Sequence, residues 1–319
     1  MSDIFEGFGD IEDFAEDLQD PSPGTRIMAV RDLADSADPA AIPYLATAIE
    51  DSDAGVRLQA AQALADFEGP ETAAALVSGL RDDDEKVRTA ASVSLTELKE
   101  PASGPPLLDA LDDPDVIVRL GALRGLIELR LPEALAPAIR ALESSNPDER
   151  AAAVAVIGWL QDETALPALM AAARDTDPGV RRTATQAFGF SRTDRAEAAL
   201  IAALKDGDWQ VREAAAETLA KSGSLSAADP LMAALDDDLW QVRLKAARSL
   251  GRLGVTAAAE KIGPQLALDI PNLRKECAAV LGELAQPESR VYLEPFAHDP
   301  DPDVRKNVRW ALERIAGAA

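Results

Sequence analysis

Few side chains in this sequence could carry out acid–base or nucleophilic chemistry. His298 is the only histidine and Cys277 the only cysteine among the 319 residues. His298 falls in a segment expected to be a surface loop, and Cys277 falls in an apolar helix face, where a buried thiol is inert. The sequence has no phosphate-binding glycine loop, no dinucleotide-binding motif and no Ser-His-Asp set. We therefore expect no catalytic residue, no cofactor and no metal site.

The charge of the chain limits its binding partners. The net charge is -24 and the isoelectric point about 4.4, so the surface repels nucleic acids and anionic membranes. The sequence has no run of 18 apolar residues, the length that could cross a bilayer, and its N-terminus does not resemble a secretory signal. These features predict a cytoplasmic protein. The 24 Arg against 8 Lys and 33 Asp against 23 Glu suit a salt-rich cytoplasm, although a biased genome with Asp-rich turns would give the same composition.

An arginine recurs at intervals of 31 residues along the whole chain. The ten members are Arg26, Arg57, Arg88, Arg119, Arg150, Arg181, Arg212, Arg243, Arg274 and Arg305. We call them the ladder arginines and number other positions from them. A small or apolar residue follows at +3 and a large apolar residue at +7, and Val precedes seven of the ten arginines at -1. These offsets share one stripe of an α-helix. Because the regularity extends over every unit, we expect the arginines to pair with nearby Asp residues and to hold successive repeats together.

Each repeat also contains the signals that begin this helix and a second, shorter one. An N-capping residue stands at -4 in eight repeats, with Leu239 and Ile270 as the exceptions, and Pro often follows it. Apolar residues at +19 and +23, such as Leu45 and Ile49, indicate the second helix. Neither helix can bury its apolar stripe alone. The sequence therefore predicts an all-α fold, an α-solenoid of 31-residue two-helix repeats.

The two ends of the chain differ from the internal repeats. Residues 10–19 match only the second helix and are expected to cap the N-terminus. At the other end Arg309 and Glu313 occupy columns that hold Ala and Gly earlier. We therefore expect an acidic-aromatic tail over 1–9 and a single solenoid over 10–319, with a cap helix, nine helix pairs and a final helix at about 302–316.

These repeats resemble the HEAT-like repeats named after phycobilisome lyases. The resemblance rests on stretches such as 208–220 and 240–251, which carry Trp-Gln-Val-Arg followed by Ala-rich helix, and it covers residues 10–316. It implies that the Val-Arg helix lines a concave face where partners bind. Related metal hydroxylases bind iron through several His-Glu pairs, which one histidine cannot supply.

Partner choice should depend on the positions at which the repeats differ. On the Val-Arg helix these are +1, +5 and +9, opposite the buried stripe, and Arg and Trp there are typical of interface hot spots. The residues predicted to bind a protein partner are Arg124, Trp159, Gln186, Phe190, Arg248, Arg252, Trp310 and Arg314, with Leu244 beside them. The alternative is a solvated helix face with aromatic residues placed by chance.

Two other regions could contact a partner. Trp209 and Trp240 begin consecutive Val-Arg helices and could form an apolar edge, although we favour packing between repeats as their role. Residues 1–9 carry Ile4, Phe5 and Phe8 among acidic residues and could be a docking motif or a cover for the first repeat.

We expect a scaffold or adaptor that binds a protein partner and is monomeric on its own. The family resemblance leaves two further possibilities open, a bilin lyase subunit acting on phycobiliproteins and an adaptor in archaeal taxis signalling.

Overall fold

Helices make up all the regular secondary structure of residues 11–318, the part of the chain that the computed structural model describes. These residues form two compact units, one ending at Leu160 and the other beginning at Gln161. The prediction of an all-α fold is confirmed. The predicted tail over 1–9 lies outside the described residues.

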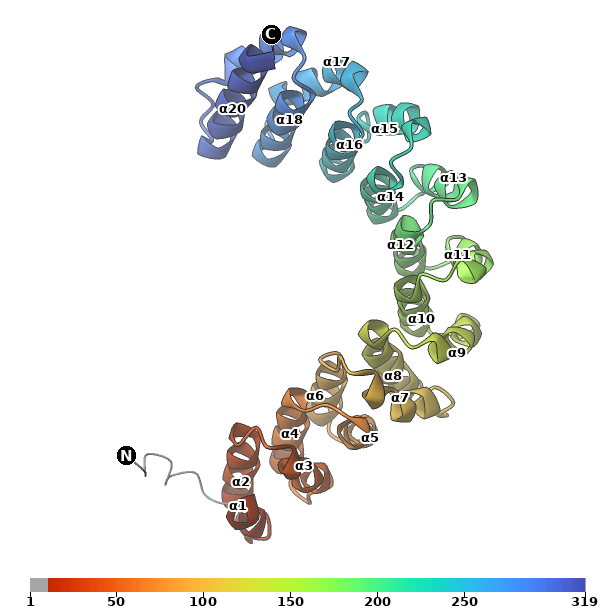
Figure 1. The fold of residues 1–319 in the computed structure, drawn as a ribbon, viewed down its shortest axis with the longest axis vertical. Coiled ribbons are helices and arrows are strands. Elements are labelled where there is room, and N and C mark those ends of the chain that lie inside the picture. Colours follow the sequence, from red (N-terminus) through yellow and green to blue (C-terminus); the bar gives the residue numbers. More distant parts are fainter. Residues whose placement is uncertain (1–10, 319) are drawn as a thin grey trace. The chain divides into compact units, whose positions relative to one another are not determined.

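Unit 1 contains ten α-helices. Their bounds are α1 (Ile11–Asp17), α2 (Pro23–Asp35), α3 (Ile42–Ala48), α4 (Ala54–Ala63), α5 (Pro70–Gly79), α6 (Glu85–Leu95), α7 (Gly104–Ala110), α8 (Val116–Leu129), α9 (Leu135–Ala141) and α10 (Pro147–Leu160). Within the unit the even-numbered helices pack side by side in one layer and the odd-numbered helices lie in the other (Figure 1). The even-numbered helices carry the ladder arginines, and we call them the Val-Arg helices; the odd-numbered ones are the short helices.

Unit 2 repeats this arrangement. Its helices are α11 (Leu166–Ala172), α12 (Pro178–Ala187), α13 (Asp194–Ala203), α14 (Trp209–Ser222), α15 (Ala228–Ala234), α16 (Trp240–Arg252), α17 (Ala259–Ile262), α18 (Pro271–Leu284), α19 (Arg290–Leu293) and α20 (Pro302–Ala318). The short helices α17 and α19 are single turns that continue as 3-10 turns. No helix of the described residues is long and apolar enough to cross a membrane.

The core lies between the two layers of each unit. The +3 residues from Ala29 to Val308 are fully covered, as are most +7 residues, including Leu33 and Phe188. Alanine at +3 lets the layers approach closely, while the Leu column fills the space between them. The predicted Asp and Asn N-caps accept backbone N–H groups, as the Asp53 carboxylate does from Gly55 and Val56. The predicted cap Ser22 makes no such bond with its side chain. Leu239 and Ile270 cap nothing with their side chains.

Candidate functional site

The ladder arginines join consecutive repeats through paired hydrogen bonds. Arg57 donates from Nε and Nη2 to the two carboxylate oxygens of Asp82, at 2.6 and 2.9 Å, and from Nη1 to the carbonyl of Asp51 at 2.9 Å. The same pairing joins Arg26 to Asp51, Arg181 to Asp206 and Arg212 to Asp237. Arg274 forms an ion pair with Asp299 but only one hydrogen bond to it, from Nη2 at 3.3 Å. The acceptor stands at +25, in the loop that begins the next repeat. These bonds support the structural interpretation of the arginine column.

The pairing shifts the pKa values of both partners in the direction that favours their charged forms. The hydrogen bond from Arg57 holds the pKa of Asp82 below its usual value, and the same bond raises the pKa of Arg57. Both groups therefore stay charged at neutral pH. Because each is engaged with the other, these guanidinium groups are not a free track for a polyanion.

The repeats of Arg119 and Arg88 depart from this pattern. Position +25 from Arg119 is Ser144, and Glu149 supplies the carboxylate instead, at 2.7 Å, with the Ser144 hydroxyl donating to it. Arg88 would pair with Asp113, but Arg81 forms that ion pair. Within the described part of the chain Arg88 donates to the carbonyls of Asp82 and Asp83, and it is one of the residues that line an open hollow.

The surface of the Val-Arg helices that points away from the short helices is the open face of each unit. Of the residues predicted to bind a partner there, Arg124, Gln186, Arg252 and Arg314 are exposed. Trp159 is 42% and Trp310 40% exposed, which is unusual for such large apolar side chains. Phe190 does not lie on the helix itself, since α12 ends at Ala187 and a 3-10 turn, η6 (Phe188–Phe190), leaves its ring half-buried.

Some of the predicted contacts are already satisfied within the chain. Arg248 is half-buried and bonds Glu276 on the neighbouring helix α18 through two hydrogen bonds of 2.6 Å, which raise the pKa of Arg248. Lys245 pairs with Glu217 in the same way, between α16 and α14. Arg248 therefore ties repeats together, whatever it contributes to binding.

The two exposed tryptophans each have an arginine over the ring. The guanidinium of Arg130 lies 4.9 Å from the ring centre of Trp159, and that of Arg314 lies 5.7 Å from the ring centre of Trp310. A cation over the ring fixes the aromatic side chain and adds modest stability. Trp209 and Trp240, in contrast, are half-buried at the first residue of α14 and α16.

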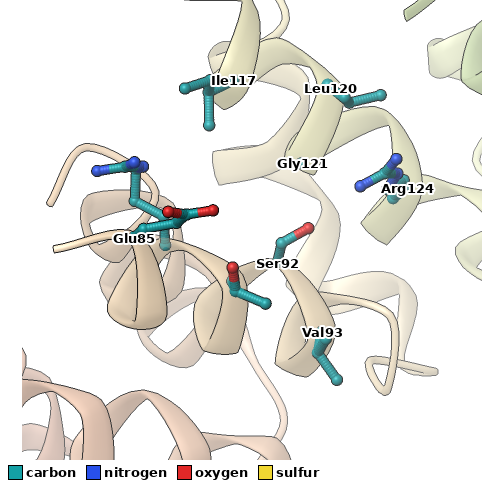
Figure 2. A pocket seen from close by; sticks show the side chains of 9 residues that line it. Glu85, Ser92, Val93, Ile117, Leu120, Gly121 and Arg124 are labelled. Carbon is teal, nitrogen blue, oxygen red and sulfur yellow. The ribbon is translucent and has the colours of Figure 1, made fainter. Parts of the chain in front are cut away.

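The open face of unit 1 contains two adjacent hollows, one on each side of α6. The hollow between α4 and α6 measures about 620 Å³ and includes Leu58, Gln62 and Val93. The hollow between α6 and α8 measures about 300 Å³, and Figure 2 shows Ile117, Leu120 and Arg124 entering it from α8, opposite Glu85 and Ser92 of α6. Gly121 also lines this hollow and lets Leu80 pack closely against α8, because a Cβ atom there would lie 2.5 Å from Leu80.

Exposed aliphatic side chains stand beside these hollows. Val93 is 58% and Ile117 42% exposed. Neither residue was among those predicted to bind a partner, because the prediction rested on Arg and aromatic side chains. Val93 stands at +5 from Arg88, so the variable columns already contained the signal. Ile117 stands at -2 from Arg119, outside those columns.

The described residues offer little for catalysis. Burial raises the pKa of the Cys277 thiol to about 12, so it stays protonated and unreactive. His298 is exposed, as predicted. Among residues 11–318 no group of three His, Cys, Asp or Glu side chains could hold a metal ion.

The sequence matches a family model over most of its length. The model describes HEAT repeats and matches residues 11–96, 104–189 and 170–251. The chain belongs to the HEAT-repeat family. The predicted phycobilisome-lyase subgroup is a finer assignment, and it stays a prediction.

Solved HEAT-repeat structures share this fold at low sequence identity. Kap95p, in a structure with RanGDP, is 15% identical with a TM-score of 0.73, over 100% of this chain and 53% of that one. Yeast importin-beta (Kap95p) is 14% identical with a TM-score of 0.69, over 96% and 52%. YibA of E. coli is 18% identical with a TM-score of 0.54, over 93% and 99%.

These identities show a common fold and no more. The chain spans about half the length of the importin-beta structures that it matches. No curated protein sequence matches it.

Proposed function

We propose that this HEAT-repeat chain is a protein-interaction scaffold that holds a partner protein on the open face of its Val-Arg helices. The observation that carries the proposal is the pair of hollows beside α6, with Val93 and Ile117 exposed around them. Exposed aliphatic side chains grouped around a hollow are typical of protein-binding surfaces. Kap95p, which has a similar fold, is described in structures with RanGDP and in a complex with Nup1.

The proposed surface keeps the residues selected from the sequence. In unit 1 these are Arg124 and Trp159, to which the structure adds Val93 and Ile117. In unit 2 they are Gln186, Phe190, Arg248, Arg252, Trp310 and Arg314. Arg and Trp side chains contribute strongly to binding when a partner excludes water from them. Each of the two exposed tryptophans, Trp159 and Trp310, already has an arginine over its ring.

Purified partner offers the direct test. The immobilised chain would capture its partner from the native organism at native salt, and calorimetry would then measure binding of the purified pair. We expect Val93→Asp to weaken binding about tenfold, or roughly 1.4 kcal/mol, because a charge enters an apolar contact. Trp159→Ala should cost about 2 kcal/mol or more.

A matched control separates this face from the opposite layer. Val291 on the short helix α19 is 66% exposed, so Val291→Asp introduces the same charge at a similar exposure. It should leave the affinity unchanged, and neither valine variant should change the melting temperature. Loss of the partner with Val291→Asp but not with Val93→Asp would place binding on the short helices and contradict the proposal.

The finer roles suggested by the family resemblance are a bilin lyase subunit and an adaptor in archaeal taxis signalling. Incubation with a bilin addresses the first. New visible absorbance bands that stay with the protein after gel filtration would support a lyase. Their absence would favour the scaffold function over the lyase.

A further inference from the structure

Acidic residues form a row along one margin of the open face of unit 1. They stand at +9 from four consecutive ladder arginines and are all exposed: Asp35, Asp66, Glu97 and Glu128. Lys99 pairs with Glu128 at 2.7 Å. The other three make no ion pair with any residue of the described part of the chain.

The position of this acidic row is unfavourable for the helices that carry it. Asp35 is the last residue of α2, Glu97 follows α6 by two residues, and Glu128 lies in the last turn of α8. The C-terminus of a helix carries partial negative charge and favours Lys or Arg. The helix ends therefore do not favour carboxylates here, and only Glu128 has an ion-pair partner among the described residues.

Unit 2 shows that packing does not require acidic residues at +9. There the same position holds the exposed cations Lys221, Arg252 and Arg314, the uncharged Phe190, and Glu283 as the acidic exception. Both signs of charge fit the architecture. Packing therefore does not explain why the four charged residues at +9 in unit 1 are all acidic. We attribute their negative charge to the function of this surface and to what binds it.

Two members of the acidic row are close in sequence to residues that line the hollows: Asp66 follows Ala65, and Glu97 stands four residues after Val93. The apolar walls of the hollows come from Leu58, Val93, Ile117 and Leu120, at or near the +1 and +5 positions. The cations that line the hollows are Lys86 and Arg88, nearer the other end of the helices, and Arg124 at +5. A bound segment would thus meet apolar walls along its centre and carboxylates along one side.

We propose that this groove of unit 1 binds an amphipathic, basic helix of a partner protein, with apolar side chains in the hollows beside Val93 and Lys or Arg side chains against Asp66 and Glu97. The proposal rests on the scaffold function and adds the chemistry of the partner. Packed helices lie about 10 Å apart, and seven residues of an α-helix span about 10.5 Å. A helix lying across α4, α6 and α8 would therefore present one basic residue per heptad to each acidic residue.

Synthetic helices test this chemistry without the native partner. The probes are two labelled 21-residue peptides of three identical heptads, one of Leu and Lys and one of Leu and Glu, with binding followed by fluorescence anisotropy at about 0.15 M salt. We expect saturable binding of the Lys peptide to the full chain and none of the Glu peptide. Tighter binding of the Glu peptide would overturn the proposal.

Net charge alone would attract a basic peptide to any part of this protein, so the variants must isolate the groove. Asp66→Lys with Glu97→Lys should weaken the Lys peptide about tenfold, since two exposed pairs are lost and replaced by repulsion. Asp109→Lys with Glu143→Lys makes the same change in net charge at exposed residues near the ends of the short helices α7 and α9. It should change the affinity less than about twofold. Equal losses in the two double variants would show attraction to net charge only and would sink the proposal.

Val93→Asp gives a second, independent readout. It adds a negative charge, so binding by charge alone would tighten, whereas binding in the apolar groove would weaken. Tightening would contradict the proposal even if the protein remains folded, which circular dichroism would establish. Should the native partner depend on Val93 and Trp159 but not on Asp66 and Glu97, the scaffold function stands and this inference fails.

Discussion

At the scale of single residues, the aspartate at +25 is the joint between repeats. Asp82 accepts two hydrogen bonds from Arg57 and one from its own loop at the N–H of Asp84, while its carbonyl accepts from Arg88. One residue thus contacts the arginines of the preceding and the following repeat. Its side chain is only 7% exposed, so water screens the charge pair weakly.

The pair of Arg57 and Asp82 should make the stability of the protein depend on pH in the acid range. Arg57 lowers the folded-state pKa of Asp82 below its unfolded value of about 3.9. The resulting stability is present above that unfolded value and is lost as the pH falls through the folded pKa. We expect urea midpoints to stay level from pH 7 to about 5 and to fall below about pH 4.

Asp82→Asn should be less stable than the natural chain at pH 7 by about 1–3 kcal/mol, because it leaves Arg57 without a charged acceptor. It should lose less on acidification. Asp83→Asn, at the exposed neighbouring residue, is the control and should follow the natural chain. Parallel acid curves for Asp82→Asn and the natural chain would show that this pair does not govern the response.

The sequence indicated which residues are in the ladder but not which partner each one takes. Spacing placed Arg88 and Arg248 in their columns. It could not show that Arg81 would occupy the carboxylate of Asp113, or that Arg248 would bond Glu276. Long side chains reach several acceptors, and the choice depends on rotamers that spacing does not specify.

At the scale of elements, the sequence predicted helix starts better than helix ends. Asp and Asn caps marked the starts of the Val-Arg helices, and proline at the first position reinforced several of them. The ends depended on local conformation: α12 stops at Ala187, and a 3-10 turn moves Phe190 off the face predicted for it. The short helix α17 ends after Ile262, since Gly263 and Pro264 begin a 3-10 turn.

The repeat between α16 and α18 lacks one connection of the ladder. Position +25 from Arg243 is Leu268, and Arg243 Nε is buried without a hydrogen-bond partner. The nearby carboxylate of Asp237 is already engaged by Arg212 and by the N–H of Leu239. Unlike the repeat with Ser144, this one supplies no substitute acceptor for Arg243 among the described residues.

Leu268→Asp should restore the missing connection. A carboxylate at this position satisfies Arg243 as Asp237 satisfies Arg212, and we expect the free energy of unfolding to rise by about 1 kcal/mol. Chemical denaturation monitored by circular dichroism would measure it. Leu268→Asn has nearly the same shape without the charge and should gain less. A less stable Leu268→Asp variant would mean that the apolar contacts of Leu268 outweigh the pair.

At the scale of the whole molecule, the repeat period predicted the fold class, and the match to HEAT repeats bears it out. The period could not predict the division at Leu160, because Arg150 and Arg181 keep the same 31-residue spacing as every other pair. Surface features escaped prediction for a related reason. The hollows beside α6 depend on the sizes of side chains from three helices, which no single column describes.

Net charge is the property of the whole chain with the clearest consequence for stability. The 56 acidic residues outnumber the 32 Lys and Arg, and salt acts on them in two opposing ways. It weakens the repulsion among exposed carboxylates, and it weakens attractive ion pairs. The ladder pairs have side chains mostly below 20% exposed, as for Arg212 and Asp237 at 15% and 10%, and buried pairs are screened much less.

Repulsion is therefore the contribution that salt should remove. Between about 0.05 and 1 M KCl the screening length falls from above 10 Å to about 3 Å, and we expect the melting temperature to rise by roughly 5–10 °C. Differential scanning calorimetry at fixed pH would record it. Sucrose at equal osmolality is the control and should give a smaller rise, since it is excluded from the protein surface but does not screen charge. A melting temperature that falls with KCl would show that exposed ion pairs stabilise this protein more than repulsion among its carboxylates destabilises it.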